Sequence, residues 1–131
     1  NNKQAEWRTN PATSGIAGCL LDIGTHASTL VEYITGQRIT EVCSDVSTFV
    51  QGRSLDDDAA VLFRTSNGAR GTLIASQICA GEENGFSIRI YGEAGGIEWR
   101  QLEPNSLIIM RPNKPTQKAI LKPLQIYTRT S

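Results

Sequence analysis

The sequence predicts an α+β domain in which one main helix packs on one face of a largely antiparallel, open sheet of about six strands. Three observations predict this class. Apolar residues recur at helical spacing between Gly15 and Ile34, apolar and polar residues alternate from Ile39 to Val50, and an Asn67-Gly68 pair separates two later strand-like runs. A helical period that gives way to a period of two and to hairpin turns is typical of a helix followed by an antiparallel sheet.

The helix is expected to run from Gly15 to Ile34. Thr13 or Ser14 is expected to cap its amino-terminal end, and Gly36 is placed to end it. Its apolar positions are Ile16, Cys19, Leu20, Ile23, Ala27, Leu30, Val31 and Ile34.

The strands are expected to form hairpins. In the first strand, Val42, Ser44, Val46, Thr48 and Val50 should share one face. Further strands are expected at residues 59–65 and 69–78, which the Asn67-Gly68 turn joins; at 86–91 and 97–101, joined through residues 92–96; and at 106–111 and 118–121. Ile88, Ile90, Ile97 and Trp99 are expected to point outward, so that a second copy or another domain packs on the sheet.

Length, charge and cysteine content indicate which classes of protein the chain can belong to. A length of 131 residues fits a single domain spanning residues 1–131, and 13 basic residues balance 13 acidic ones, so the charge favours neither nucleic acid nor a membrane surface. The run of about 20 apolar residues that a membrane span needs is absent from the sequence. Three widely spaced cysteines, Cys19, Cys43 and Cys79, suit buried free thiols in a reducing, cytoplasmic compartment.

Asp22 and His26 are the candidate catalytic pair. His26 is the only histidine of the chain, and it follows Asp22 by four residues within a stretch of small and apolar side chains. On a helix the two side chains share a face, and imidazole exchanges a proton near neutral pH. A packed core histidine fits the same spacing. A metal site usually needs three or four ligands, so no metal is expected, although a metal-dependent lyase or isomerase stays a third hypothesis.

Other polar residues are more ambiguous. Trp7 and Arg8 could line a sugar pocket, because an aromatic face stacks on a sugar ring and a guanidinium donates to hydroxyls, or they could anchor the terminus to the core. Asp56, Asp57 and Asp58 are interpreted as a solvated entry to a strand, and Cys19 as a small core residue.

The order of these elements resembles a known family. The segment Gly15-Ile16-Ala17-Gly18-Cys19-Leu20-Leu21-Asp22-Ile23-Gly24-Thr25-His26, followed by an antiparallel sheet with the turn Tyr91-Gly92-Glu93-Ala94-Gly95-Gly96-Ile97-Glu98-Trp99, resembles the carboxy-terminal domain of the Gfo/Idh/MocA oxidoreductases. This is the glucose–fructose oxidoreductase and inositol dehydrogenase group. The resemblance runs over essentially the whole chain. It implies a fold like the carboxy-terminal domain of glyceraldehyde-3-phosphate dehydrogenase.

The resemblance also implies a function. In that family an amino-terminal Rossmann domain binds NAD or NADP, and the second domain places a sugar, polyol or related carbonyl compound over the nicotinamide. His26 would exchange a proton with the substrate hydroxyl, and Asp22 would bind substrate and position His26. The chain has no G-x-G-x-x-G after a strand and no Glu-Lys-Pro segment, so no residue here is expected to bind the cofactor.

The chain is therefore expected to be the substrate-binding and oligomerisation domain of an NAD(P)-dependent dehydrogenase, inactive alone and without tight cofactor binding of its own. The parent is expected to be a homodimer or tetramer that associates through the sheet. The alternative is a non-catalytic module for sheet-mediated dimerisation or interaction.

Overall fold

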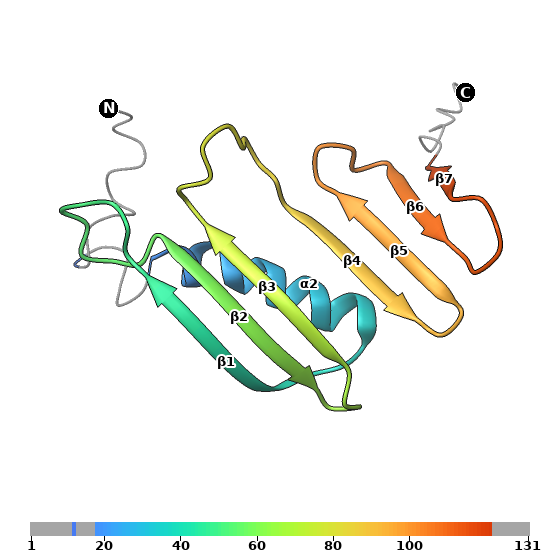
Figure 1. Cartoon of the computed structure of the whole chain (residues 1–131), viewed down its shortest axis with the longest axis horizontal. Coiled ribbons are helices and arrows are strands. Elements are labelled where there is room, and N and C mark those ends of the chain that lie inside the picture. Colours follow the sequence, from blue (N-terminus) through green and yellow to red (C-terminus); the bar gives the residue numbers. More distant parts are fainter. Residues whose placement is uncertain (1–11, 13–17, 122–131) are drawn as a thin grey trace, which may run out of the picture. The chain divides into compact units, whose positions relative to one another are not determined.

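The structure, a computed structural model, describes residue 12 and residues 18–121, and the chain divides between Gly81 and Glu82 into two units. In the described part of the first unit, a short π-helix, η2 (Leu20–Gly24), continues directly into α2 (Thr25–Thr35). Three antiparallel strands follow in the spatial order of the sequence: β1 (Ile39–Ser47), β2 (Asp58–Thr65) and β3 (Arg70–Ser76). Figure 1 shows α2 behind this sheet.

The core of the first unit lies where the start of the helix meets β2 and β3. Cys19, Ala59 and Ala75 are fully buried there, and Leu20, Ile23 and Leu73 pack against them at the margin. Because the central side chains are small, the helix can lie close to the sheet.

Gly24 also allows the helix to lie close to the sheet. A Cβ at Gly24 would lie 2.9 Å from Cδ1 of Leu20 and 3.8 Å from Cδ2 of Leu73. The small residues of the helix thus serve packing against the sheet.

The helix ends at the predicted glycine. Gly36 adopts a left-handed conformation with φ of +66°, and its N–H donates to the carbonyl of Glu32 at 2.9 Å. This is the geometry that favours glycine after a helix. The Glu32 carboxylate then accepts the N–H of Ile39 at 2.8 Å, which ties the helix end to the first residue of β1.

The predicted alternation of β1 is confirmed for its central residues. Val42, Ser44 and Val46 lie opposite Phe63, Val61 and Ala59 of β2, and directly opposite residues of a sheet share a face. The strand ends at Ser47 rather than Val50, because the N–H groups of Phe49 and Val50 donate to the carboxylate of Asp57 instead of to a neighbouring strand.

The Asn67-Gly68 hairpin is also confirmed. β2 and β3 pair antiparallel, and the turn places Gly68 at φ of +84°. Side chains bond within the turn, because the amide oxygen of Asn67 accepts the Thr65 hydroxyl at 2.6 Å and the N–H of Ala69 at 3.3 Å. Glycine suits the positive φ at position 68, and the side chain of Asn67 supplies the hydrogen bonds within the turn.

The second unit is a four-stranded antiparallel meander. Its strands follow the order of the sequence: β4 (Ser87–Gly92), β5 (Gly95–Arg100), β6 (Ser106–Met110) and β7 (Gln117–Ile120). The β4–β5 hairpin is confirmed, but its loop is shorter than predicted, because Gly92 and Gly95 still pair and only residues 93–94 lie between the strands.

The four apolar residues predicted to point outward share one face of β4 and β5. Ile88 lies opposite Trp99, and Ile90 lies opposite Ile97. All four are partly buried, and the Trp99 ring packs edge-on against Phe86 with 6.1 Å between ring centroids. The most exposed apolar side chains lie elsewhere, and the packing of a second copy or another domain on these four residues stays a prediction.

The opposite face of β4 and β5 carries a buried carboxylate. Glu98 accepts from Nε of Arg89 at 2.9 Å and from Nε of Arg100 at 2.6 Å. The hydrogen bonds from Arg100 and Arg89 hold the pKa of Glu98 below its usual value. A buried carboxylate with two partners is a satisfied structural group.

Neither helix of the described residues has the length and apolar character of a membrane span.

Candidate active site

The predicted pair lies at a change of helix type. Asp22 is the middle residue of the π-helix η2, and His26 is the second residue of α2. The sequence predicted one regular helix here, and the five-residue π-helical segment corrects that expectation. Short π-helical segments inside α-helices are rare and occur frequently at functional sites.

Asp22 and His26 remain on one side of this helix. A spacing of four residues is close to one full turn in either helix type, so the side chains leave the backbone in similar directions. His26 is exposed and Asp22 is partly exposed, whereas Gly24 between them is buried. Because His26 is exposed, the core-histidine alternative is wrong.

The amino-terminal end of this helix is held by Asp56, from the loop before β2. The carboxylate of Asp56 accepts the N–H of Gly18 through Oδ1 and, through Oδ2, the N–H of Leu20 at 2.8 Å and the thiol of Cys19 at 3.2 Å. The backbone carbonyl of Asp56 accepts the N–H of Cys19 at 3.0 Å. Asp56 thus satisfies backbone donors that a helix start leaves without internal partners.

Gly18 connects the contacts of Asp56 to the candidate site. Its carbonyl accepts the N–H of Asp22 at 3.0 Å, while its own N–H donates to Asp56. A Cβ at Gly18 would lie 2.2 Å from the backbone oxygen of Asp56, so only glycine fits the contact. The predicted caps Thr13 and Ser14 lie outside the described residues.

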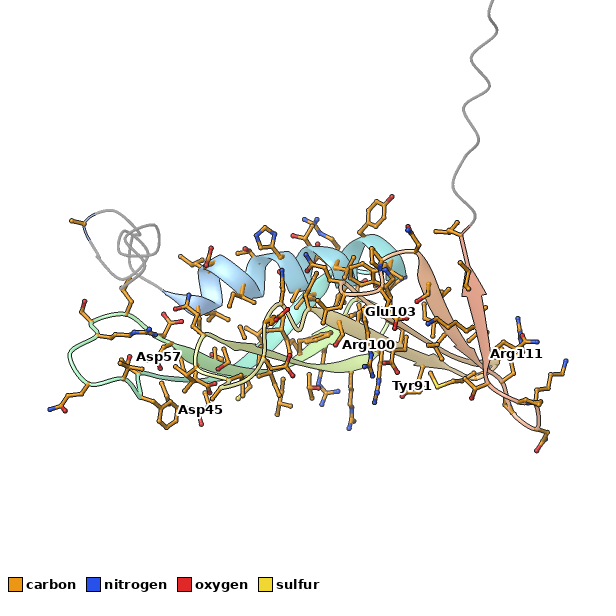
Figure 2. The ribbon with its side chains drawn as sticks, turned by 90° about the horizontal axis from the view of Figure 1, so that it is seen from above. Asp45, Asp57, Tyr91, Arg100, Glu103 and Arg111 are labelled. Atoms are coloured by element: carbon orange, nitrogen blue, oxygen red, sulfur yellow. The ribbon has the colours of Figure 1, made fainter. Side chains whose placement is uncertain are left out.

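Asp57 holds the loop between β1 and β2. Its side chain is 0% exposed, and its carboxylate accepts the N–H of Phe49 at 2.8 Å and that of Val50 at 3.0 Å, with Nη1 of Arg53 at 3.5 Å. Figure 2 shows Asp57 at the end of the sheet where this loop lies.

The pKa values of both carboxyls are lowered. For Asp57 the hydrogen bond from Phe49 outweighs the effect of burial and keeps its pKa low. For Asp56 burial opposes ionisation, but the hydrogen bonds from Leu20, Gly18 and Cys19 hold its pKa below the usual value. The interpretation of residues 56–58 as a solvated strand entry is therefore wrong, because two adjacent carboxylates each organise a separate backbone segment.

The cysteines differ from one another. Cys19 is buried as predicted, and its thiol also donates to the carbonyl of Ala75 at 3.3 Å. Burial, followed by the hydrogen bond and charge of Asp56, raises the pKa of Cys19 to about 12, so this thiol is no nucleophile at neutral pH. Cys43 and Cys79 are exposed, which corrects the expectation that all three are buried.

The side of the first sheet that faces away from the helix is apolar and open. Leu62 of β2 is 61% exposed and Ile74 of β3 is 74% exposed, and Cys43 and Asp45 of β1 border them. Figure 2 shows α2 on one side of this sheet and Asp45 on the other.

Two of the predicted site residues, Trp7 and Arg8, lie outside the described residues. Across residues 18–121, the structure brings together no group of three His, Cys, Asp or Glu side chains that could hold a metal ion. The residues that sequence reasoning missed are Asp56 and Gly18. Gly18 could have been noticed as a glycine inside a helical pattern, a position that usually has a packing reason.

Comparison with known proteins gives the family. Residues 1–98 match the family model of the GFO/IDH/MocA C-terminal domain. The uncharacterized oxidoreductase YfiI of Bacillus subtilis is 37% identical over 117 residues, which cover 88% of this chain and 30% of YfiI. Levoglucosan dehydrogenase of Pseudarthrobacter phenanthrenivorans is 26% identical over 119 residues, which cover 73% of this chain and 30% of that enzyme.

Solved structures agree with the sequence matches. An inositol dehydrogenase homologue of Azotobacter vinelandii, crystallised with NAD⁺, superposes with a TM-score of 0.86 at 31% identity, over 92% of this chain and 31% of that one. The chain thus spans about a third or less of the length of these relatives. Because the family model matches residues 1–98, this chain belongs to the GFO/IDH/MocA C-terminal domain family, as its motifs predicted.

Proposed function

We propose that this chain is the substrate-binding and oligomerisation domain of a cytoplasmic, NAD(P)-dependent oxidoreductase that acts on a sugar, a polyol or a related hydroxy or carbonyl compound. The observation that carries the proposal is the placement of Asp22 and exposed His26 on one side of a helix at a π-to-α transition. The names of its relatives support the substrate class. One solved homologue is titled as an inositol dehydrogenase homologue with NADH and myo-inositol, at 30% identity and a TM-score of 0.80.

His26 is proposed as the acid–base residue. Oxidation of a secondary alcohol requires removal of the hydroxyl proton, and imidazole has an ordinary pKa close to neutral. Asp22, on the same side of the helix, would accept a hydrogen bond from substrate or from the imidazole and so orient the ring. Trp7 and Arg8 are proposed as further substrate contacts, on the sequence argument alone.

Among residues 18–121, no strand leads into a helix. A nicotinamide cofactor is usually bound where a strand leads through a glycine-rich turn into a helix. In residues 18–121 the glycine-rich turn at residues 92–96 joins β4 to β5 instead. We propose that NAD or NADP binds to a Rossmann domain elsewhere in the parent protein, and that this chain alone is inactive.

The open face of the first sheet supports an assembly role. Leu62 and Ile74 present apolar surface, which is typical of a surface that another protein covers. We propose that a second copy covers it and forms a dimer or tetramer. A non-catalytic module that associates through the sheet is the second candidate, and this same face favours it.

The test is steady-state kinetics of the parent enzyme on a panel of sugars and polyols, followed by the appearance of reduced nicotinamide. His26→Ala should lower kcat by about 100- to 10,000-fold and leave the cofactor Kd unchanged, because the residue acts on the substrate proton. Arg38→Ala is the control, since Arg38 is an exposed residue just beyond α2 whose ion pair with Glu32 lies at the surface.

Unchanged turnover in His26→Ala would refute the catalytic assignment. Absence of any dehydrogenase activity, together with a stable dimer that Ile74→Asp dissociates in sedimentation, would favour the interaction module.

A further inference from the structure

We propose that Asp56 is a positioning residue for the proposed active site, which it serves by fixing the start of the π-helical segment that carries Asp22 and leads to His26. The inference rests on the proposed function for its catalytic consequence. Its structural part rests on the contacts of Asp56 alone.

The first step is the number of contacts concentrated on one residue. Asp56 binds three successive residues, Gly18, Cys19 and Leu20, through its carboxylate and its backbone carbonyl. Leu20 is also the first residue of η2. The contacts therefore end where the π-helical segment begins.

The second step is the link from the Asp56 contacts to the candidate site. The carbonyl of Gly18 accepts the N–H of Asp22, so a single residue, Gly18, carries both the Asp56 contact and the Asp22 contact. Cys19 also links the same turn to the sheet, because its single S–H is shared between the carbonyl of Ala75 on β3 and the carboxylate of Asp56. Rotation of this turn would break these bonds together.

The third step concerns helix register. A π-helical turn contains an additional residue relative to an α-helical turn, and an α-helix advances about 100° per residue. Relaxation of η2 into regular α-helix would therefore rotate the following side chains by about 100° relative to Cys19. Because Cys19 is fixed in the core, such a change would turn Asp22 and His26 away from their present direction.

The neighbouring Asp57 provides a matched control. Both carboxylates accept two backbone N–H groups, and both have lowered pKa values. Asp57, however, binds Phe49 and Val50 of the β1–β2 loop and makes none of the described contacts to the helix start. Asp56→Asn and Asp57→Asn thus remove the same charge from adjacent positions but release different segments.

The experiment compares these two variants in the parent enzyme. An asparagine amide can replace only one accepting oxygen and presents an N–H₂ to the remaining donors, so each variant should lower the Tm. Hydrogen exchange, read by mass spectrometry, should accelerate over residues 18–26 in Asp56→Asn and over residues 48–53 in Asp57→Asn.

The kinetic readout separates positioning from general stability. Asp56→Asn should lower kcat/KM on the order of 100-fold with an unchanged cofactor Kd, because a small displacement of reacting groups is costly. Asp57→Asn should keep kcat within about two-fold at a temperature where both variants are folded, because its loop carries no proposed catalytic group.

Each remaining result has a defined meaning. Equal kinetic losses in the two variants, or exchange over residues 18–26 that is unchanged in Asp56→Asn, would overturn the positioning role. If His26→Ala and Asp22→Asn keep full turnover, the proposed function fails instead, and the exchange data still decide whether Asp56 fixes the helix start.

Discussion

Alkylation of the three cysteines tests the structure of the helix start directly. Treatment with iodoacetamide at pH 8 should modify Cys79 rapidly and leave Cys19 unmodified, since only the thiolate reacts and Cys19 is both buried and raised in pKa to about 12. An ordinary free thiol, with a pKa of about 8.5, is about one-quarter ionised at that pH. A thiol with a pKa of about 12 is ionised to only about one part in 10,000.

Compared with an ordinary thiol, Cys19 should therefore react more than about 1,000-fold more slowly from ionisation alone, before burial slows access further. The measurement is a time course of peptide masses covering each cysteine. Alkylation of Cys19 at a rate within ten-fold of Cys79 under native conditions would refute the buried contact between Cys19, Asp56 and Ala75. Denaturant should abolish the difference, which controls for peptide detection.

Cys43 reports on the proposed assembly in the same experiment. It borders the open face of Leu62 and Ile74, so a second copy on that face should protect it. Its alkylation should slow as the protein concentration rises, and Ile74→Asp should remove that dependence. Alkylation that does not depend on concentration while the protein is dimeric would place the interface elsewhere.

Two further predictions concern stability. The pKa of the Cys19 thiol is raised in the folded state. Its contribution to the free energy of unfolding is therefore complete below about pH 8.5, the ordinary pKa of a thiol, and is lost as the pH rises toward 12. Between pH 8 and 10, the free energy of unfolding should fall with pH more steeply than in Cys19→Ala, and the two slopes should differ by about 1 kcal/mol per pH unit. Urea titrations of both proteins across this range measure the two slopes. Separately, Gly18→Ala should destabilise by about 1–3 kcal/mol, because its Cβ would lie 2.2 Å from the Asp56 oxygen, whereas Gly92→Ala, which meets nothing within 4 Å, should be tolerated in thermal unfolding.

The elements with local signals could be predicted from the sequence. Gly36 ends the helix and Asn67-Gly68 forms a hairpin because the energetics of each depend on a few adjacent residues. The alternation of β1 likewise identified which side chains share a face. The candidate pair followed from a spacing of four residues, which survives the change from α- to π-helical winding.

The remaining features depend on contacts between distant residues. Asp56 reaches Gly18 across 38 positions and Leu20 across 36, and no local pattern distinguishes Asp56 from Asp57 or Asp58. The π-helical turn is set by those contacts and by the packing of Cys19, so a helical period in the sequence does not reveal it. The early end of β1 has a similar cause, since the carboxylate of Asp57 replaces a strand partner for two N–H groups.

In the first unit, the proposed catalytic residue and the proposed assembly face lie on opposite sides of the sheet. His26 is exposed on the helix. Ile74 is exposed on the side of the β1–β2–β3 sheet that carries Asp45, since both lie opposite Ala60, and Figure 2 shows Asp45 on the side away from α2. A second copy on the open side would bury Leu62 and Ile74 without covering His26. Substitutions at Ile74 should therefore change the oligomeric state first, whereas those at Asp56 and His26 should change turnover within an unchanged oligomer.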